Sequence, residues 1–266
     1  MSLTLDLHQH FGALIGVPGS SGDAHAGLER DCETRLAFMD RFGIAKAALM
    51  PGHSYSAPRG LIDIEAINDG LHDYGQLAPE RFCALFGTVD PRHGTASIAE
   101  VERVAGLGFR GLSWHHRMQG LPIDHPVMFE IVARMDALGL VAMMHCYAHG
   151  DFEAPWRLRR HAERFHDTTF VALDAMTSPE NLELLLGIAE RCGNVHIDLT
   201  TTQLGARGVL LALERGAADR LVFGSNYYSM SNPGGIAALD ALDSAGLDES
   251  ARLAILGGNA ARILEG

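Results

Sequence analysis

The chain has 266 residues, of which 47% are hydrophobic and 20% are charged, and its formal net charge is −12. This composition predicts a packed core and argues against a largely disordered chain. The negative charge argues against nucleic acid and anionic membrane surfaces as partners, because both are bound by clustered positive charge.

The four cysteines are scattered along the chain and form no CxxC pair. This spacing argues against a disulfide framework and against a thiolate zinc site, and it suits a reducing compartment. No run of residues approaches the roughly 20 apolar residues of a membrane helix, and the N-terminus shows no signal-peptide pattern. We therefore expect an untargeted, cytoplasmic protein.

Eight short apolar runs recur along the chain, and each is followed by a turn and a segment with helical periodicity. They predict strands at 3–8, 45–50, 82–89, 109–114, 140–145, 169–174, 195–200 and 221–225.

Two of the intervening helices have clear boundaries. One is predicted to begin near Pro126 and to end at Gly139, with apolar residues three to four positions apart between them. The other begins with Ser178 as N-cap and Pro179 at the first helical position, and it ends near Gly193.

Eight strands alternating with helices can close into a barrel or lie open as a doubly wound sheet. The strand count favours the barrel, and 266 residues suit one barrel of roughly 250 residues. An open dinucleotide-binding sheet calls for GxGxxG after the first strand, where this chain has His-Gln-His-Phe-Gly. We predict an α/β protein, a single-domain (β/α)8 TIM barrel over residues 1–266.

Catalytic groups of such a barrel gather at the carboxyl ends of its strands, and most of the histidines of this chain lie at or near those ends. Residues two apart in a strand point to the same side, so Asp6, His8 and His10 are predicted to project together. The two imidazoles can chelate a divalent metal, and His145 would complete a three-histidine set. A His-x-His pair alone is often incidental; its position at a strand end strengthens the interpretation.

Three segments carry a resemblance to a known family: residues 6–10, residues 221–228 and residues 256–264. Together they resemble the amidohydrolase-related (amidohydrolase 2) family of the amidohydrolase superfamily, which contains TIM-barrel metal-dependent hydrolases, decarboxylases and lactonases. The similarity spans essentially the whole chain. It implies that the metal ligands include His8, His10 and His145.

The chain departs from the family pattern at two strand ends. Where the family often has a histidine after strand six, this chain has Asp174, and where it has Gly-Ser-Asp on strand eight, this chain has Asn226. An asparagine amide is neither acidic nor basic at neutral pH, so Asn226 cannot shuttle a proton as the family aspartate does. Asp174 restores one carboxylate, as fourth ligand or base; the alternative is that activity is lost.

The leading hypothesis is hydrolysis of a small carboxylated amide, ester or lactone by metal-activated water. His8, His10, His145 and Asp174 would hold the metal, with zinc first and manganese, iron or nickel as alternatives. A non-oxidative decarboxylase and a metal-independent lactonase are alternatives on the same barrel. A catalytically degenerate binding protein is a further alternative.

Further candidate residues follow the same strand ends. The predicted catalytic residues are His145, Asp174, Asn226 and His116, of which His116 is a candidate for carrying protons and Asn226 for orienting water or substrate. Positive or potentially positive groups predict an anionic small-molecule substrate, and the predicted substrate-binding residues are His53, His115, Arg117, Tyr147 and Tyr227. Each has an alternative interpretation as an ordinary loop residue, an ion-pair partner or a packing aromatic. No segment marks a subunit interface, so a homo-oligomer stays an open expectation.

Overall fold

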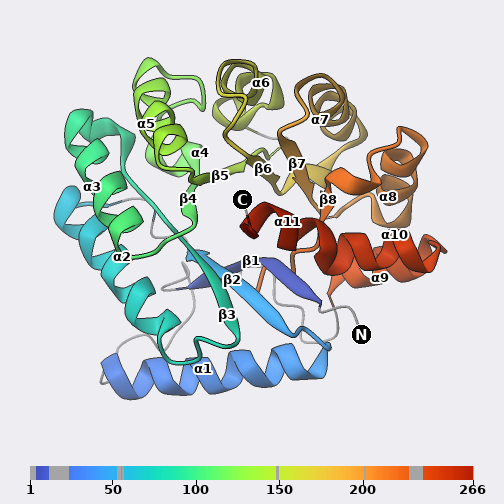
Figure 1. Ribbon diagram of the computed structural model, residues 1–266, viewed down its shortest axis with the longest axis horizontal. Coiled ribbons are helices and arrows are strands. Elements are labelled where there is room, and N and C mark those ends of the chain that lie inside the picture. Colours follow the sequence, from blue (N-terminus) through green and yellow to red (C-terminus); the bar gives the residue numbers. More distant parts are fainter. Residues whose placement is uncertain are drawn as a thin grey trace.

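The computed structural model describes residues 4–11, 24–52, 55, 57–147, 150–200, 202–227 and 236–265. Within these residues eight parallel strands follow one another in chain order around a nearly closed barrel, with helices on the outside (Figure 1). The predicted single-domain (β/α)8 barrel is therefore confirmed.

The strands lie close to their predicted positions. They are β1 (Leu5–Phe11), β2 (Lys46–Pro51), β3 (Phe82–Gly87), β4 (Gly111–Trp114), β5 (Val141–His145), β6 (Phe170–Leu173), β7 (Val195–Asp198) and β8 (Leu221–Val222).

The helices include short 3-10 turns (η1 to η4) and one π-helical segment (η5). They are α1 (Ala24–Arg41), α2 (Leu61–Gly75), η1 (Pro91–His93), α3 (Thr95–Gly106), α4 (His116–Gln119), α5 (Pro126–Ala137), η2 (Asp151–Glu153), α6 (Pro155–Arg164), η3 (Ala175–Thr177), α7 (Pro179–Cys192), α8 (Gly205–Glu214), η4 (Ala218–Arg220), α9 (Ala237–Ser244), α10 (Glu249–Leu253), η5 (Ala254–Gly258) and α11 (Asn259–Glu265).

The two predicted helix boundaries are confirmed by α5 and α7. The Ser178 side chain accepts a hydrogen bond from the backbone N–H of Asn181 at 3.2 Å, which caps α7 at its N-terminus. Gly193 ends α7 in the left-handed conformation with φ 73°, where a side chain would be strained.

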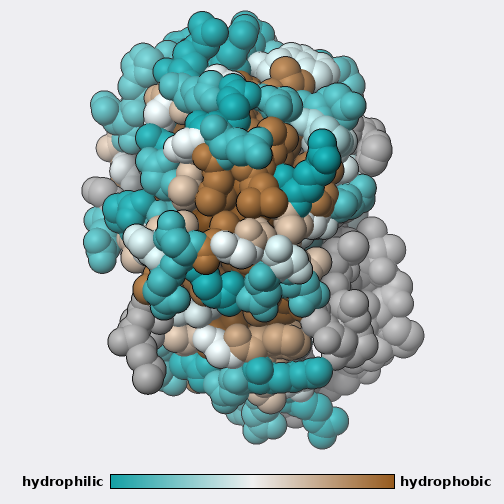
Figure 2. Space-filling model, turned by 90° about the vertical axis from the view of Figure 1, so that its right-hand side faces the viewer, coloured by the Kyte–Doolittle hydropathy of each residue, from teal (hydrophilic) through white to brown (hydrophobic). Residues whose placement is uncertain are grey.

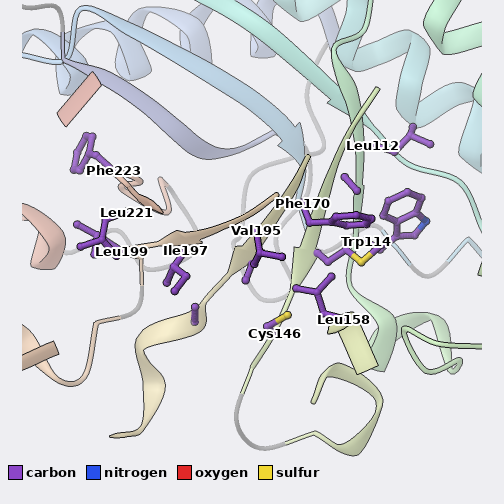
Figure 3. Packing of buried hydrophobic residues seen from close by; sticks show 14 of the residues in the cluster. Leu112, Trp114, Cys146, Leu158, Phe170, Val195, Ile197, Leu199, Leu221 and Phe223 are labelled. Atoms are coloured by element: carbon purple, nitrogen blue, oxygen red, sulfur yellow. The ribbon is translucent and has the colours of Figure 1, made fainter. Parts of the chain in front are cut away.

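The strands are buried on both faces and therefore separate two apolar layers. Between the strands and the helices, Phe170 of β6 and Val195 of β7 lie near Leu158 of α6, and Ile197 of β7 belongs to the same layer (Figure 3). A smaller cluster fills the inside of the barrel; its members are Leu5, Leu7, Ala48, Met50, Ala84, Phe86, Val141, Met143, Val171, Leu173, Val222, Ala260 and Ile263.

The last helix closes the amino-terminal end of the barrel. Ala260 and Ile263 of α11 belong to the inner cluster, and α11 lies near the centre of the ring of strands in Figure 1. The amide of Asn259 donates hydrogen bonds to the carbonyl oxygens of Ala218 at 2.8 Å and Leu221 at 2.6 Å. Part of the C-terminal family motif thus anchors α11 to β8.

Strand β1 contains an irregularity that matters for the site. Asp6 pairs with Ala47 and Gln9 pairs with Leu49, so three steps along β1 match two along β2. Such a bulge inserts one residue and reverses the alternation of side chains beyond it. Ala47 and Leu49 both belong to the outer layer, so Asp6 and Gln9 face outward with them.

The bulge corrects the prediction for Asp6. Leu7 points into the barrel before the bulge, and His8 and His10 converge on each other after it. The Asp6 carboxylate instead accepts a hydrogen bond from the Gln9 side chain at 2.8 Å. The prediction that Asp6, His8 and His10 project in one direction is therefore wrong for Asp6.

The face shown in Figure 2 is mainly hydrophilic but carries apolar side chains. Figure 2, which faces the side where α8 and α9 lie in Figure 1, shows apolar residues gathered in the middle of that face. Leu210 of α8 is among the large hydrophobic residues exposed to solvent. Within the described residues, no helix combines the length and apolar character that a membrane span requires.

Candidate active site

Three histidines meet inside the barrel at the carboxyl ends of the strands. His8 and His10 lie on β1 and His145 ends β5, and one ring nitrogen from each lies within 4.8 Å of the others. The Nε2 atoms of His8 and His10 are 3.0 Å apart. All three side chains are buried. The structure therefore brings together the three histidines that the sequence predicts.

Backbone carbonyl groups hold two of the rings. The His10 Nδ1 lies 2.8 Å from the carbonyl oxygen of Pro51, and the His145 Nδ1 lies 2.7 Å from that of Trp114. A carbonyl oxygen only accepts hydrogen bonds, so each Nδ1 carries a proton and donates it. The Nε2 of each neutral ring then presents a lone pair to the centre of the cluster.

A carboxylate holds the third ring. The His8 Nδ1 lies 2.7 Å from Oδ2 of Asp198 at the end of β7. Burial acts to lower the pKa of His8, but the Asp198 charge outweighs it and the pKa is raised. The Thr200 hydroxyl bonds the same carboxylate oxygen. A Cβ atom at Gly224 would lie 2.5 Å from Asp198 Oδ1, so this contact requires glycine there.

The cluster suits a divalent metal. Imidazole nitrogens bind zinc, iron, nickel and copper, and the hydrogen bonds at Nδ1 are the outer contacts that orient metal-bound histidines. With Nδ1 of both rings donating, the Nε2 lone pairs of His8 and His10 face each other at 3.0 Å. That arrangement is repulsive without a proton or a cation between them. The donor set therefore fits a metal ion.

Asp174 and Asn226 lie at the edge of the cluster. The Asn226 amide donates to Oδ1 of Asp174 at 3.3 Å, and the Thr200 hydroxyl lies 3.3 Å from the same oxygen. Asp174 and Asn226 have φ values of 53° and 54°, a left-handed conformation that is uncommon outside glycine. Such strain concentrates at functional sites. Asp174 is not among the residues grouped within 4.8 Å, so its predicted metal contact stays a prediction.

A second group of polar side chains adjoins His145. The His115 ring stacks on the His145 ring with centroids 4.2 Å apart and an angle of 2°. The His115 Nδ1 lies 2.5 Å from the buried carboxylate of Glu153. Arg117 donates from Nη2 to the His115 Nε2 at 3.2 Å. Because a guanidinium only donates, Nε2 accepts and the proton of His115 is on Nδ1.

Burial shifts the pKa values of His145 and Glu153. It lowers the pKa of His145 to about 3, and the neighbouring His115 adds to the effect. Burial also raises the pKa of the Glu153 carboxyl. A neutral His145 keeps its nitrogen lone pair available at neutral pH, as a metal ligand requires.

Arg117 places a positive charge on the solvent side of this group. Its side chain is 41% exposed and lies 3.7 Å from Glu153. Its guanidinium covers the Tyr147 ring, 4.6 Å from the centroid. The predicted substrate-binding residues His115, Arg117 and Tyr147 therefore lie together, and Arg117 is also an ion-pair partner, as its alternative interpretation expected.

Comparison with known proteins places the chain in a family. The sequence profile of a family described as Amidohydrolase matches residues 6–266. This chain belongs to the amidohydrolase family. A comparison with curated protein sequences gave no match.

Several solved structures share the barrel. The 5-carboxyvanillate decarboxylase of Sphingomonas paucimobilis has a TM-score of 0.72 and 18% identity, covering 100% of this chain and 99% of that chain. The 2,6-dihydroxybenzoate decarboxylase of Rhizobium has a TM-score of 0.73 and 18% identity, with the same coverage. A dihydroxybenzoic acid decarboxylase of Polaromonas sp. JS666, with bound manganese and 2-nitroresorcinol, has a TM-score of 0.71 and 17% identity, covering 100% and 97%. At these identities the likeness shows the fold alone.

Two of the predicted site residues, His116 and Tyr227, have side chains that lie away from the three histidines of this amidohydrolase-family chain. The His116 ring stacks on Trp114 with centroids 6.3 Å apart, and Trp114 belongs to the layer between strands and helices. Burial, with a smaller effect of His161, lowers the pKa of His116 to about 3. The Tyr227 ring packs 4.3 Å from Phe38 of α1, on the outer side of the barrel. His53 lies outside the described residues.

Sequence reasoning missed several residues that orient the site. Asp198 could have been found, because the apolar neighbours Val195 and Ile197 face outward and alternation then turns Asp198 inward. Glu153 carried no signal, since it lies on a short connection after β5. Tyr55 was also missed; its ring lies edge-on to His115 and His145, with centroids 5.9 Å from each.

Proposed function

We propose that this chain is a metal-dependent decarboxylase of small aromatic carboxylates. The observation that carries the proposal is the convergence of His8, His10 and His145 beside His115 and Arg117. A cluster suited to a cation thus lies next to a cationic side chain, and an aromatic acid with a carboxylate and a neighbouring oxygen would satisfy both. Aromatic acid decarboxylases with the same fold support this choice over hydrolysis.

The metal would be divalent and held by His8, His10 and His145. When bound, such an ion supplies positive charge that polarises and orients substrate oxygens. Three imidazoles suit zinc, which was the first expectation. The manganese in the related Polaromonas structure makes manganese an equal candidate.

Arg117 and its neighbours would bind and orient the acid. A guanidinium can hold a carboxylate with two parallel hydrogen bonds, and 41% of the Arg117 side chain reaches solvent, where a substrate would arrive. The contact between Arg117 and His115 Nε2 is a single hydrogen bond at 3.2 Å. A substrate carboxylate, which is a stronger acceptor, can replace it.

Decarboxylation requires a proton donor. The bond between the ring carbon and the carboxyl group breaks, carbon dioxide leaves, and the electron pair stays on the ring carbon, which takes up one proton. The Asn226 amide cannot donate that proton. The Asp174 carboxyl group, 3.3 Å from both Asn226 Nδ2 and Thr200 Oγ1, is the proposed proton donor.

Hydrolysis is the second candidate function. The position of Asp174 supports it less strongly than it supports decarboxylation. A carboxylate that accepts a hydrogen bond from the Asn226 amide can also act as a general base toward water. The two reactions are chemically distinct, because hydrolysis adds the elements of water whereas decarboxylation releases carbon dioxide and adds a proton.

The test is to incubate the manganese-loaded and zinc-loaded protein with 2,6-dihydroxybenzoate and 5-carboxyvanillate in D2O. We expect carbon dioxide and a product with one deuterium at the carbon that lost the carboxyl group. His145→Ala should abolish this, whereas the exposed His166→Ala, a matched control, should not.

Other outcomes would contradict the proposal. Turnover of esters or lactones without carbon dioxide release would support hydrolysis, and such turnover in metal-free protein would support the metal-independent lactonase. Thermal stabilisation by an acid without any product would support a binding protein.

A further inference from the structure

Arg35 of α1 is buried beside the cluster of His8, His10 and His145. Its side chain is fully buried (0% exposed), although burying a guanidinium is costly unless it is paired and hydrogen-bonded. It lies on the outer side of β1, so it cannot touch a substrate inside the barrel. A charge in this position calls for a structural or positioning role.

The hydrogen bonds of Arg35 converge on β1. Its Nη2 donates to the backbone carbonyl oxygen of His10 at 2.7 Å. Its Nη1 donates to the Gln9 side chain at 3.0 Å. Its Nε donates to the Tyr74 hydroxyl at 2.9 Å, and that hydroxyl donates to Asp31 at 2.5 Å. The guanidinium is thus fixed by partners on α1, α2 and β1.

Arg35 also contacts the segment that follows β8. Its guanidinium covers the Tyr227 ring, 4.7 Å from the centroid, a cation–π contact of the kind that strengthens when it is desolvated. Tyr227 directly follows Asn226. One side chain therefore connects the strand of His8 and His10 with the segment of Asn226.

These contacts lie at the seam where the barrel closes. Strand β8 is only Leu221–Val222, and beyond it the seam consists of separate hydrogen bonds. Asn226 N–H donates to the His8 carbonyl at 2.9 Å, and His10 N–H donates to the Tyr227 carbonyl at 2.5 Å. Arg35 bonds the His10 carbonyl directly, so a charged side chain reinforces a seam that lacks a regular ladder.

We propose that Arg35 is a positioning residue that clamps the β1–β8 seam and thereby sets the metal affinity of the site. The inference rests on the proposed function insofar as His8, His10 and His145 hold the metal. Loss of the guanidinium would free the His10 backbone to move relative to His8. The Nε2 atoms of His8 and His10, two residues that follow the β1 bulge, are 3.0 Å apart. This separation would no longer be fixed.

The test measures binding of Co2+ to metal-free protein, using the visible absorption of the bound ion. Arg35→Met keeps the length of the side chain and removes the hydrogen bonds and the charge. We expect roughly 10-fold to 100-fold weaker Co2+ binding, the range typical for lost outer contacts of metal ligands. Arg35→Lys, which can still reach one acceptor, should restore part of the affinity.

Arg81→Met is the matched control. Arg81 also donates to backbone carbonyls, those of Ala45 at 2.9 Å and Ile44 at 3.1 Å, but it does so before β2, at the amino-terminal end of the barrel. This variant should unfold at a lower temperature and keep the Co2+ affinity and absorption spectrum of the wild type. A merely structural Arg35 would behave in the same way.

The outcomes separate the two proposals. If wild-type protein binds no Co2+, the metal-dependent function fails and the positioning role fails with it. If wild type binds Co2+ and Arg35→Met binds it equally, only the positioning role fails. If Arg35→Met does not fold, Arg35→Lys decides: weaker binding with an altered absorption spectrum supports the role, and unchanged binding overturns it.

Discussion

The two ends of the barrel differ in the polarity of their buried side chains. The carboxyl ends of the strands carry buried polar groups, among them His8, His145 and Asp198. The amino-terminal end is filled with apolar side chains and closed by Ala260 and Ile263 of α11. Buried polar groups stabilise a fold little, because their hydrogen bonds mainly replace those made with water, whereas apolar burial contributes about 25 cal/mol per Å². The apolar amino-terminal end therefore contributes mainly to stability, whereas the polar carboxyl end carries the candidate active site.

Backbone strain follows the same division. Among the residues that the structure describes, the non-glycine residues with positive φ are Asp174 and Asn226, both at the carboxyl ends of strands. Each such residue costs on the order of 1–3 kcal/mol. The apolar end must offset that cost, so substitutions at the two ends should have separable effects.

The largest effect is expected from a metal ligand. His145→Ala should lower decarboxylase activity by more than roughly 100-fold, because even outer contacts of a metal ligand typically contribute 10-fold to 100-fold. Metal content by elemental analysis should fall in parallel, while unfolding of the metal-free protein should change little. A strong loss of stability without loss of metal would contradict the division between the ends.

The reverse effect is expected at the amino-terminal end. Ile263 is 5% exposed and belongs to the inner cluster, so Ile263→Ala should lower the free energy of unfolding by about 3 kcal/mol. Urea denaturation measures this, and activity per folded molecule should stay at the wild-type value. Leu264→Ala, at a partly buried neighbour, should cost less. Equal costs would show that α11 does not plug the barrel.

A smaller effect is expected at the solvent side of the site. Arg117→Met should raise KM by roughly 10-fold to 100-fold, the equivalent of about 1.5–3 kcal/mol for hydrogen bonds to a charged group. The turnover number should change less, because Arg117 is proposed to bind the acid rather than to transfer the proton. Arg159→Met, at an arginine paired with Glu163 on α6, is the control. A fall in kcat alone would instead give Arg117 a role in the transition state.

The smallest effect concerns pH. Burial, with the nearby Arg220, lowers the pKa of His196 inside the amino-terminal end to about 4. The unfolded chain takes up this proton near pH 6.5 and the folded chain only near pH 4, so the unfolded state binds more protons between these values. Stability should fall as pH falls through this window. His196→Gln should make the fall shallower in urea denaturation, and an unchanged slope would contradict the shift.

Much of this molecule could be predicted from its sequence. Strand positions follow from apolar runs of a few residues and helix ends from Ser178 and Gly193, all of which are local signals. The grouping of His8, His10 and His145 could be predicted because the carboxyl ends of all barrel strands lie on the same face. The amidohydrolase resemblance depends on short contiguous motifs, so it too was available from the sequence.

Only the tertiary structure decided which residues orient those histidines. His8 and Asp198 are 190 positions apart, and no local pattern connects them. The direction of Asp6 depends on a one-residue bulge against β2, and that of Tyr227 depends on packing against Phe38 and Arg35 of α1. Side-chain periodicity along one strand determines local alternation, whereas bulges and contacts between distant strands arise only when the barrel closes, because they depend on the fit of neighbouring elements.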